Sequence, residues 1–242
     1  MRIQTVELYK LAKIAFFLFA ISNVPILSAQ EKVVTLHVIF PGKLQTDTSN
    51  VVVWLKSLDA TDSNSMKPPE KRNQVVQKNK SFQPHLTVVR VGSIVDFPNR
   101  DPFFHNVFSL FDGKRFDLGL YEAGATNSVR FDHVGISYLF CNIHPEMSAV
   151  VVAVDTPYYG ISDKAGNVSI ANVPDGKYEM HFWDERSLPE ALKRLTRQVR
   201  ISSEVRDLGT ISVPQDPSFT PTHKNKYGQD YAPPPKQGYP QP

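Results

Sequence analysis

The chain has 242 residues, of which 41% are apolar, 21% are charged and 19 are proline, a composition typical of a globular protein. Its single cysteine excludes an intramolecular disulfide and any metal cluster held by several cysteines. The formal charge of +3 arises in the first 29 and the last 29 residues, so the neutral segment between them lacks the basic surface that nucleic acid requires.

The N-terminus has the three-part pattern of a secretory signal. Three basic residues precede the apolar run 14–21, and Pro25 leads to small residues that end at Ala29. A membrane anchor is the alternative, but the run is shorter than the ~20 apolar residues that span a bilayer. We therefore expect a signal peptide over 1–29, cleaved near Ala29, and a secreted or periplasmic protein whose only contact with a membrane is through this signal.

Alternating or apolar segments divided by turn residues predict an all-β body from about 33 to 213. The expected strands are 34–39, 51–55, 86–91, 94–97, 106–111, 136–140, 149–154, 168–170, 178–182 and 208–213. The segment 149–154 is apolar on both faces, which predicts a strand covered on both sides. The polar segment 59–73 predicts a connector. The segment 187–197 fits either a helix with capping-box spacing or a loop that leads into a strand.

The C-terminal segment 214–242 differs in composition from the body. Eight of its 29 residues are proline and most of the others are polar. Such a segment buries too little apolar surface to offset the entropy of folding. The sequence therefore predicts a disordered, Pro-rich tail.

Three residues with soft or nitrogen donors follow one expected strand. Cys141 ends the strand, and His144 and Met147 follow at intervals of three in a turn that can bring them to one point. A blue-copper site needs a thiolate, two imidazoles and a weak thioether, and His105 at the start of another expected strand can supply the second imidazole. The alternative is that Cys141 is a buried apolar residue and that its neighbours only pack around it. A free thiol is a liability in an oxidising compartment, so the export signal favours copper.

Two segments carry a resemblance to a known family. Residues 82–101, followed by His105 and its neighbour Asn106, resemble the first half of plastocyanin-like cupredoxins, and residues 135–147 resemble their copper loop. The short His-x-x-Met spacing is most similar to amicyanin. The resemblance covers about 74–154 and implies a Greek-key β-sandwich that binds one type 1 copper ion. It implies His105, Cys141 and His144 as equatorial ligands and Met147 as the axial ligand.

The resemblance also implies how the site is surrounded. The backbone N–H of Asn106 should lie near the sulfur of Cys141, where it would tune the ligand. The edge of His144 should reach the surface as the port for electrons. An apolar rim around this port would be formed by Pro145, Phe104 and Phe140.

A second resemblance concerns the flanking segments. Residues 163–178 resemble the carboxypeptidase regulatory-like, or transthyretin-like, β-sandwich module, with an Asp…Gly turn, a strand, a Pro-x-Gly turn and a strand with a tyrosine. We therefore expect this module to be discontinuous, formed by 31–68 and 155–213, with a cupredoxin domain at 74–154 inserted into it. A single extended cupredoxin with extra strands at both ends is the simpler alternative.

These features predict an exported one-electron carrier that works between larger redox partner proteins and is not an enzyme. The alternative is a copper-binding structural or carrier module of the cell envelope with no role in electron transfer. The sequence specifies neither the partner nor the oligomeric state. The remaining histidines have no metal-ligand spacing, and we expect no second metal centre from His37, His85, His133, His181 and His223.

Overall fold

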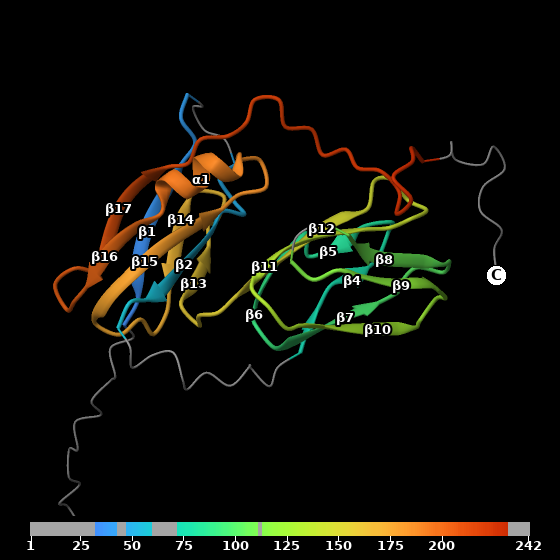
Figure 1. Cartoon of the computed structure of the whole chain (residues 1–242), viewed down its shortest axis with the longest axis horizontal. Coiled ribbons are helices and arrows are strands. Elements are labelled where there is room, and N and C mark those ends of the chain that lie inside the picture. The colour runs from blue at the N-terminus through green and yellow to red at the C-terminus, as the bar shows by residue number, and fades with distance from the viewer. Residues whose placement is uncertain (1–31, 43–46, 60–71, 111–112, 232–242) are drawn as a thin grey trace, which may run out of the picture. The chain divides into compact units, whose positions relative to one another are not determined.

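The computed structural model describes residues 32–42, 47–59, 72–110 and 113–231 (Figure 1). The expected signal peptide, most of the expected connector and residues 232–242 lie outside these ranges. The described residues form seventeen strands and one short helix, so the all-β prediction is confirmed. Within them, no helix has the length and apolar character needed to cross a membrane.

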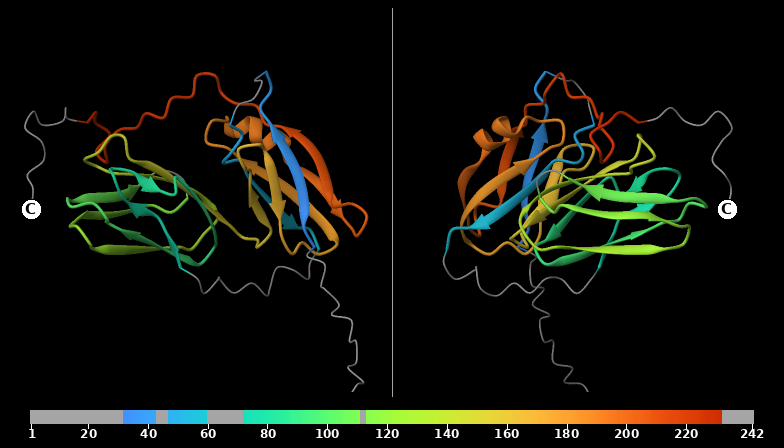
Figure 2. Two further views of the ribbon diagram at one scale, coloured as in Figure 1. Left: turned by 180° about the vertical axis from the view of Figure 1, so that it is seen from behind. Right: turned by 45° about the vertical axis from the view of Figure 1, so that its right-hand side comes forward.

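Strands from the two ends of the body pair with one another. One sheet has the order β14-β1-β17, and a second has the order β13-β2-β15-β16. Their bounds are β1 Val34–Ile39, β2 Val52–Ser57, β13 Tyr159–Ile161, β14 Asn167–Ile170, β15 Gly176–Trp183, β16 Arg197–Ile201 and β17 Asp207–Ser212. Both views of Figure 2 show β1, in blue, beside the orange-red β17, with which it pairs in parallel.

Alternation of apolar residues determines which face of these strands is buried. In β15, Tyr178, Met180 and Phe182 point to one face and are buried, as the sequence predicts. Strands β1 and β2 contribute to the same apolar cluster, and this cluster also contains residues of β14 and β17. The two flanking sheets therefore share one core. The membership of this sandwich in the carboxypeptidase regulatory-like family and the domain boundaries stay predictions.

The segment 187–197 contains both of the alternatives that its sequence allows. Helix α1 (Pro189–Leu195) buries Ala191 and Leu192, and β16 begins two residues after it. The capping box that the spacing allows does not form: Leu188 is the N-cap residue and makes no side-chain cap, and the hydroxyl of Ser187 donates to Asp184 instead (2.8 Å). Proline in the first turn needs no N–H partner, so the helix starts without this cap.

Residues 73–154 form three further sheets. Their orders are β6-β12-β11-β8-β9, β10-β7-β3 and β4-β5. The bounds are β3 Asn73–Gln74, β4 Val76–Gln77, β5 Phe82–Gln83, β6 Leu86–Arg90, β7 Ser93–Pro98, β8 His105–Ser109, β9 Phe116–Tyr121, β10 Thr126–Phe131, β11 Gly135–Phe140 and β12 Ser148–Val154. Sequence patterns did not predict β9 and β10. In β9, Phe116, Leu118 and Leu120 alternate with Asp117 and Gly119, so the signal was present but missed, whereas β10 has only two apolar residues.

Strand β12 explains why one segment is apolar on both faces. Val150, Val152 and Val154 belong to the apolar cluster shared with the flanking sheets. Ala149, Val151 and Ala153 belong to a second cluster, which also contains Cys141 and Met147. Successive side chains of a strand point to opposite faces, so β12 is covered on both sides, and the prediction for 149–154 is confirmed.

Candidate metal centre

Three strands position the four candidate ligands. β11 and β12 form an antiparallel pair in which Phe140 lies opposite Ser148, so residues 141–147 form the loop between them. β8 pairs with β11 at Phe108 and Phe140, which brings its first residue, His105, to this loop from 36 positions upstream. Within the loop, the N–H of Met147 donates to the carbonyl of His144 (3.1 Å), a tight turn.

The donor atoms of His105, Cys141 and His144 converge, and all lie within 4.8 Å of one another. The sulfur of Cys141 is 3.5 Å from Nδ1 of His144 and 3.9 Å from Nδ1 of His105. In protein zinc sites the metal–sulfur distance is about 2.3 Å and the metal–nitrogen distance is about 2.0–2.1 Å. At these lengths, a sulfur and a nitrogen in a trigonal arrangement would be about 3.8 Å apart. The cluster therefore has the spacing and the soft donor set that suit copper. Met147 is fully buried in the same apolar cluster as Cys141.

Burial sets the protonation of the two imidazoles. It lowers the pKa of His144 to about 4, with a further contribution from His105. Burial also lowers the pKa of His105, against the opposing effect of a hydrogen bond to Asp101. Both rings are therefore neutral at pH 7, and a neutral imidazole is the form that binds a metal.

The thiol of Cys141 experiences two opposing effects. Burial raises its pKa, and backbone N–H groups of Ile143, Asn106 and His144, which donate to the sulfur, work in the opposite direction. The pKa of the sulfur therefore responds to the N–H of Asn106, the group that the resemblance places near it. A metal ion supplies the charge that converts such a thiol into a thiolate. The site is prepared for a thiolate ligand but holds a thiol in the absence of metal.

The side chain of Asn106 ties the loop to its neighbouring strand. Its amide nitrogen donates to Asp117 (2.7 Å) and to the carbonyl of Gly119 (2.9 Å), both in β9. Its oxygen accepts from the N–H of Asn142 in the loop (3.3 Å). One buried amide thus links β8, β9 and the loop 141–147.

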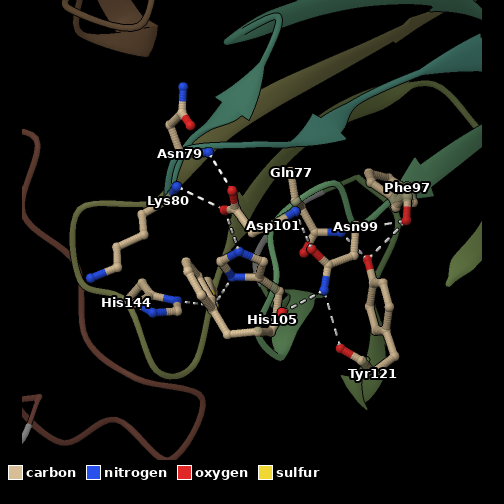
Figure 3. Close-up of polar contacts among 11 residues, drawn as sticks. Gln77, Asn79, Lys80, Phe97, Asn99, Asp101, His105, Tyr121 and His144 are labelled. Atoms are coloured by element: carbon tan, nitrogen blue, oxygen red, sulfur yellow. Dashed lines mark hydrogen bonds and ion pairs between the residues drawn. The ribbon is translucent and has the colours of Figure 1, made fainter. Parts of the chain in front are cut away.

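A polar network lies on the other side of His105 (Figure 3). Nε2 of His105 donates to the carboxylate of Asp101 (2.8 Å), whose own N–H donates to the side chain of Asn99 (3.0 Å). The amide of Asn99 donates to the carbonyl of Phe103 (2.8 Å), and Gln77 binds the hydroxyl of Tyr121 nearby. The sequence predicted no role for Asp101, because its contact with His105 depends on how the segment between β7 and β8 folds.

The expectation that the edge of His144 forms a surface port is wrong. His144 is 1% exposed. The ring of Phe103 packs against it at 5.7 Å between centroids and against His105 at 5.2 Å. Two residues of the expected apolar rim do reach the surface: Phe104 is 51% exposed, and Pro145 is also exposed.

The C-terminal segment contacts the loop 141–147 through residues for which the sequence predicted no role. The hydroxyl of Tyr231 donates to the carbonyl of Cys141 (2.8 Å), and the N–H of Lys226 donates to Asn142 (3.0 Å). The ring of His223 stacks on Phe140 with 4.1 Å between centroids. Residues 214–231 contain no helix or strand. The disordered tail was predicted for residues 214–242, and the last eleven of these residues lie outside the described ranges.

The other histidines have partners of their own. His85 binds Glu185, His133 binds Asp132 and His181 binds Glu179 (2.7–2.8 Å each). Within the described part of the chain, one group of three or more histidine, cysteine or acidic side chains is close enough together to hold a metal. It consists of His105, Cys141 and His144.

Comparisons with known proteins give similarity at the level of structure only. No family model matches the sequence, and no curated protein matches it. Similar solved structures include a reduced amicyanin variant, with 22% identity over 38% of this chain and 95% of that one (TM-score 0.32). A purple cupredoxin from Nitrosopumilus maritimus has 21% identity over 34% and 99% (TM-score 0.31). A copper-containing nitrite reductase from Thermus scotoductus SA-01 has 20% identity over 38% and 24% (TM-score 0.35), so this chain spans about a quarter of that enzyme. These values carry no argument about function, which has to rest on the donor set itself.

Proposed function

We propose that the protein binds one type 1 copper ion and carries single electrons between redox partner proteins. The observation that carries the proposal is the buried cluster of one thiol and two imidazoles, with donor separations of 3.5 and 3.9 Å around the sulfur. His105, Cys141 and His144 would hold the ion, and Met147 would be the weak axial ligand. Copper bound there would supply a one-electron couple between Cu(I) and Cu(II).

The residues of the site support an electron carrier in two ways. The two imidazoles are already neutral and already packed against Phe103, so little side-chain movement is needed when the ion changes charge. Burial of the cluster keeps water away from the thiolate. Four protein ligands would leave no coordination position for a substrate, which is why we propose a carrier and not an enzyme.

The decisive test is the colour of the copper-loaded protein. With Cu(II), the wild type should show an intense blue band from thiolate-to-copper charge transfer, and Cys141→Ser should lose it. His133→Asn, which changes an exposed imidazole bonded to Asp132, is the matched control and should remain blue. A colourless wild-type protein with the spectrum of a type 2 copper site would refute the proposal.

A copper carrier or structural module is the second candidate, and it makes a different prediction. A carrier of copper must release its ion, whereas a carrier of electrons must retain it in both oxidation states. We expect the reduced protein to hold Cu(I) in the presence of a competing chelator and to be reoxidised reversibly. Loss of the ion on reduction would favour copper delivery.

We further propose that the protein is exported. The support is the pattern of the first 29 residues, which lie outside the described structure. Protein recovered from the periplasm or the medium should begin at Gln30, as N-terminal sequencing or intact mass can show. A full-length chain that remains in the membrane fraction would favour the anchor instead.

A further inference from the structure

Asp101 is a buried carboxylate that contacts a copper-ligand candidate. It is 5% exposed and is located in the segment between β7 and β8, four residues before His105. One carboxylate oxygen accepts from the N–H of Asn79 (2.6 Å). The other accepts from the N–H of Lys80 (2.9 Å) and from Nε2 of His105 (2.8 Å). Figure 3 shows the carboxylate between these three donors.

The carboxylate determines which nitrogen of His105 carries the proton. An ionised carboxylate only accepts hydrogen bonds, so Nε2 of His105 must be the protonated nitrogen. In a neutral ring, Nδ1 then has a free lone pair, and Nδ1 is the atom that lies 3.9 Å from the sulfur of Cys141. The bond to Asp101 thus selects the tautomer in which His105 can bind a metal alongside Cys141.

The same carboxylate fastens a turn beside the site. Lys78 and Ser81 exchange both backbone hydrogen bonds, and the two residues between them have left-handed backbone angles (φ +55° at Asn79 and +52° at Lys80). Non-glycine residues adopt this conformation at a cost, which the two bonds to Asp101 offset. The amine of Lys80 lies 5.7 Å from the ring centroid of Phe103, the ring that packs on both imidazoles.

We propose that Asp101 is a positioning residue of the copper centre: it holds His105 as the Nε2–H tautomer, orients its ring and strengthens Nδ1 as a donor. This inference rests on the proposed function. A carboxylate hydrogen-bonded to a ligating imidazole increases the basicity of that ligand. The additional negative charge stabilises Cu(II) more than Cu(I), so Asp101 lowers the reduction potential of the site.

Asp101→Asn is the variant that tests this role. Asparagine has nearly the same shape but only one acceptor oxygen, so its NH₂ group would face a donor either at the turn or at His105. Asp163→Asn is the matched control, because Asp163 also accepts two backbone N–H groups (2.9 Å each) in a turn, but at an exposed position outside the cluster.

We expect Asp101→Asn to bind Cu(II) 10- to 100-fold more weakly, the range typical of lost outer-shell partners. Cu(I) affinity should fall less, and each tenfold difference between the two ions raises the potential by about 59 mV. The blue band and the Cu(II) hyperfine splitting should shift as well. Asp163→Asn should match the wild type in all of these. If the two variants have equal potentials and affinities, Asp101 only stabilises the turn, and the inference is wrong.

A measurement on the metal-free wild type separates this inference from the proposed function. Nitrogen NMR of the histidine side chains should show His105 protonated at Nε2 and bare at Nδ1. This result requires no copper and no variant, so it holds even if the loaded protein is not blue or if Asp101→Asn does not fold. Protonation at Nδ1 in the wild type would overturn the inference.

Discussion

Asn106→Ala should destabilise the metal-free protein more than the loss of an ordinary polar side chain. The substitution removes a charge-assisted bond to Asp117 (2.7 Å), a bond to the carbonyl of Gly119 (2.9 Å) and a bond from the N–H of Asn142 (3.3 Å). A hydrogen bond to a charged group contributes about 1.5–3 kcal/mol and a neutral one about 0.5–1.5 kcal/mol. The expected loss in the free energy of unfolding is therefore about 2.5–6 kcal/mol.

Asn142→Ala is the matched control, since it shortens another asparagine of the same site. The side chain of Asn142 is half-buried and accepts from the N–H of Lys226 (3.0 Å), so its loss should cost about 0.5–1.5 kcal/mol. Urea unfolding followed by circular dichroism measures both. With a slope of about 1–3 kcal/mol/M, the midpoint for Asn106→Ala should fall by at least about 0.8 M.

The comparison between the two variants can refute the reasoning. If Asn106→Ala is no less stable than Asn142→Ala, the three bonds of Asn106 do not hold β8, β9 and the copper loop together. The loop would then be supported mainly by the apolar cluster that contains Cys141 and Met147.

Three further predictions concern pH, the C-terminal segment and the axial ligand. The hydrogen bond with Glu185 raises the pKa of His85, so its contribution to stability is complete at low pH and disappears as pH rises through that pKa. The stability difference between wild type and His85→Gln should fall by up to about 1 kcal/mol between pH 6 and 9, and a constant difference would contradict this. Tyr231→Phe loses the hydrogen bond to the carbonyl of Cys141 (2.8 Å). Chemical labelling of the Cys141 thiol in the metal-free protein should therefore become up to about tenfold faster. An unchanged labelling rate would mean that the C-terminal segment does not protect this thiol. Met147→Gln replaces a soft sulfur donor with an oxygen that favours Cu(II). Voltammetry should therefore show a lower reduction potential, while the blue band persists. An unchanged reduction potential would argue against Met147 as a ligand.

Local patterns were sufficient for much of the fold. The alternation in β15 and the uninterrupted apolar run of β12 depend on which side chains face a core, and this periodicity is visible in a single segment. The pattern is short in β9, where it is formed by Phe116, Leu118 and Leu120, and weak in β10, which has two apolar residues. They form where pairing partners are available: β9 pairs with β8, and β10 pairs with β7.

The candidate site divides in the same way. Cys141, His144 and Met147 are close in sequence, and a tight turn of the loop between β11 and β12 places them together. His105 joins them only through the pairing of β8 with β11. The burial of His144 was not predictable, since it depends on packing of Phe103 from another segment.

The sequence by itself determined the all-β class, the neutral body, the lone cysteine and the three-residue spacing of the loop donors. Each of these depends on composition or on residues within a few positions of one another. Only the tertiary structure decided that Asp101 binds His105, that His144 is buried and that Tyr231 reaches the carbonyl of Cys141 across 90 positions. Hydrogen bonds and ring contacts act over a few ångströms, so such partners are chosen by how strands and loops pack and not by their order along the chain.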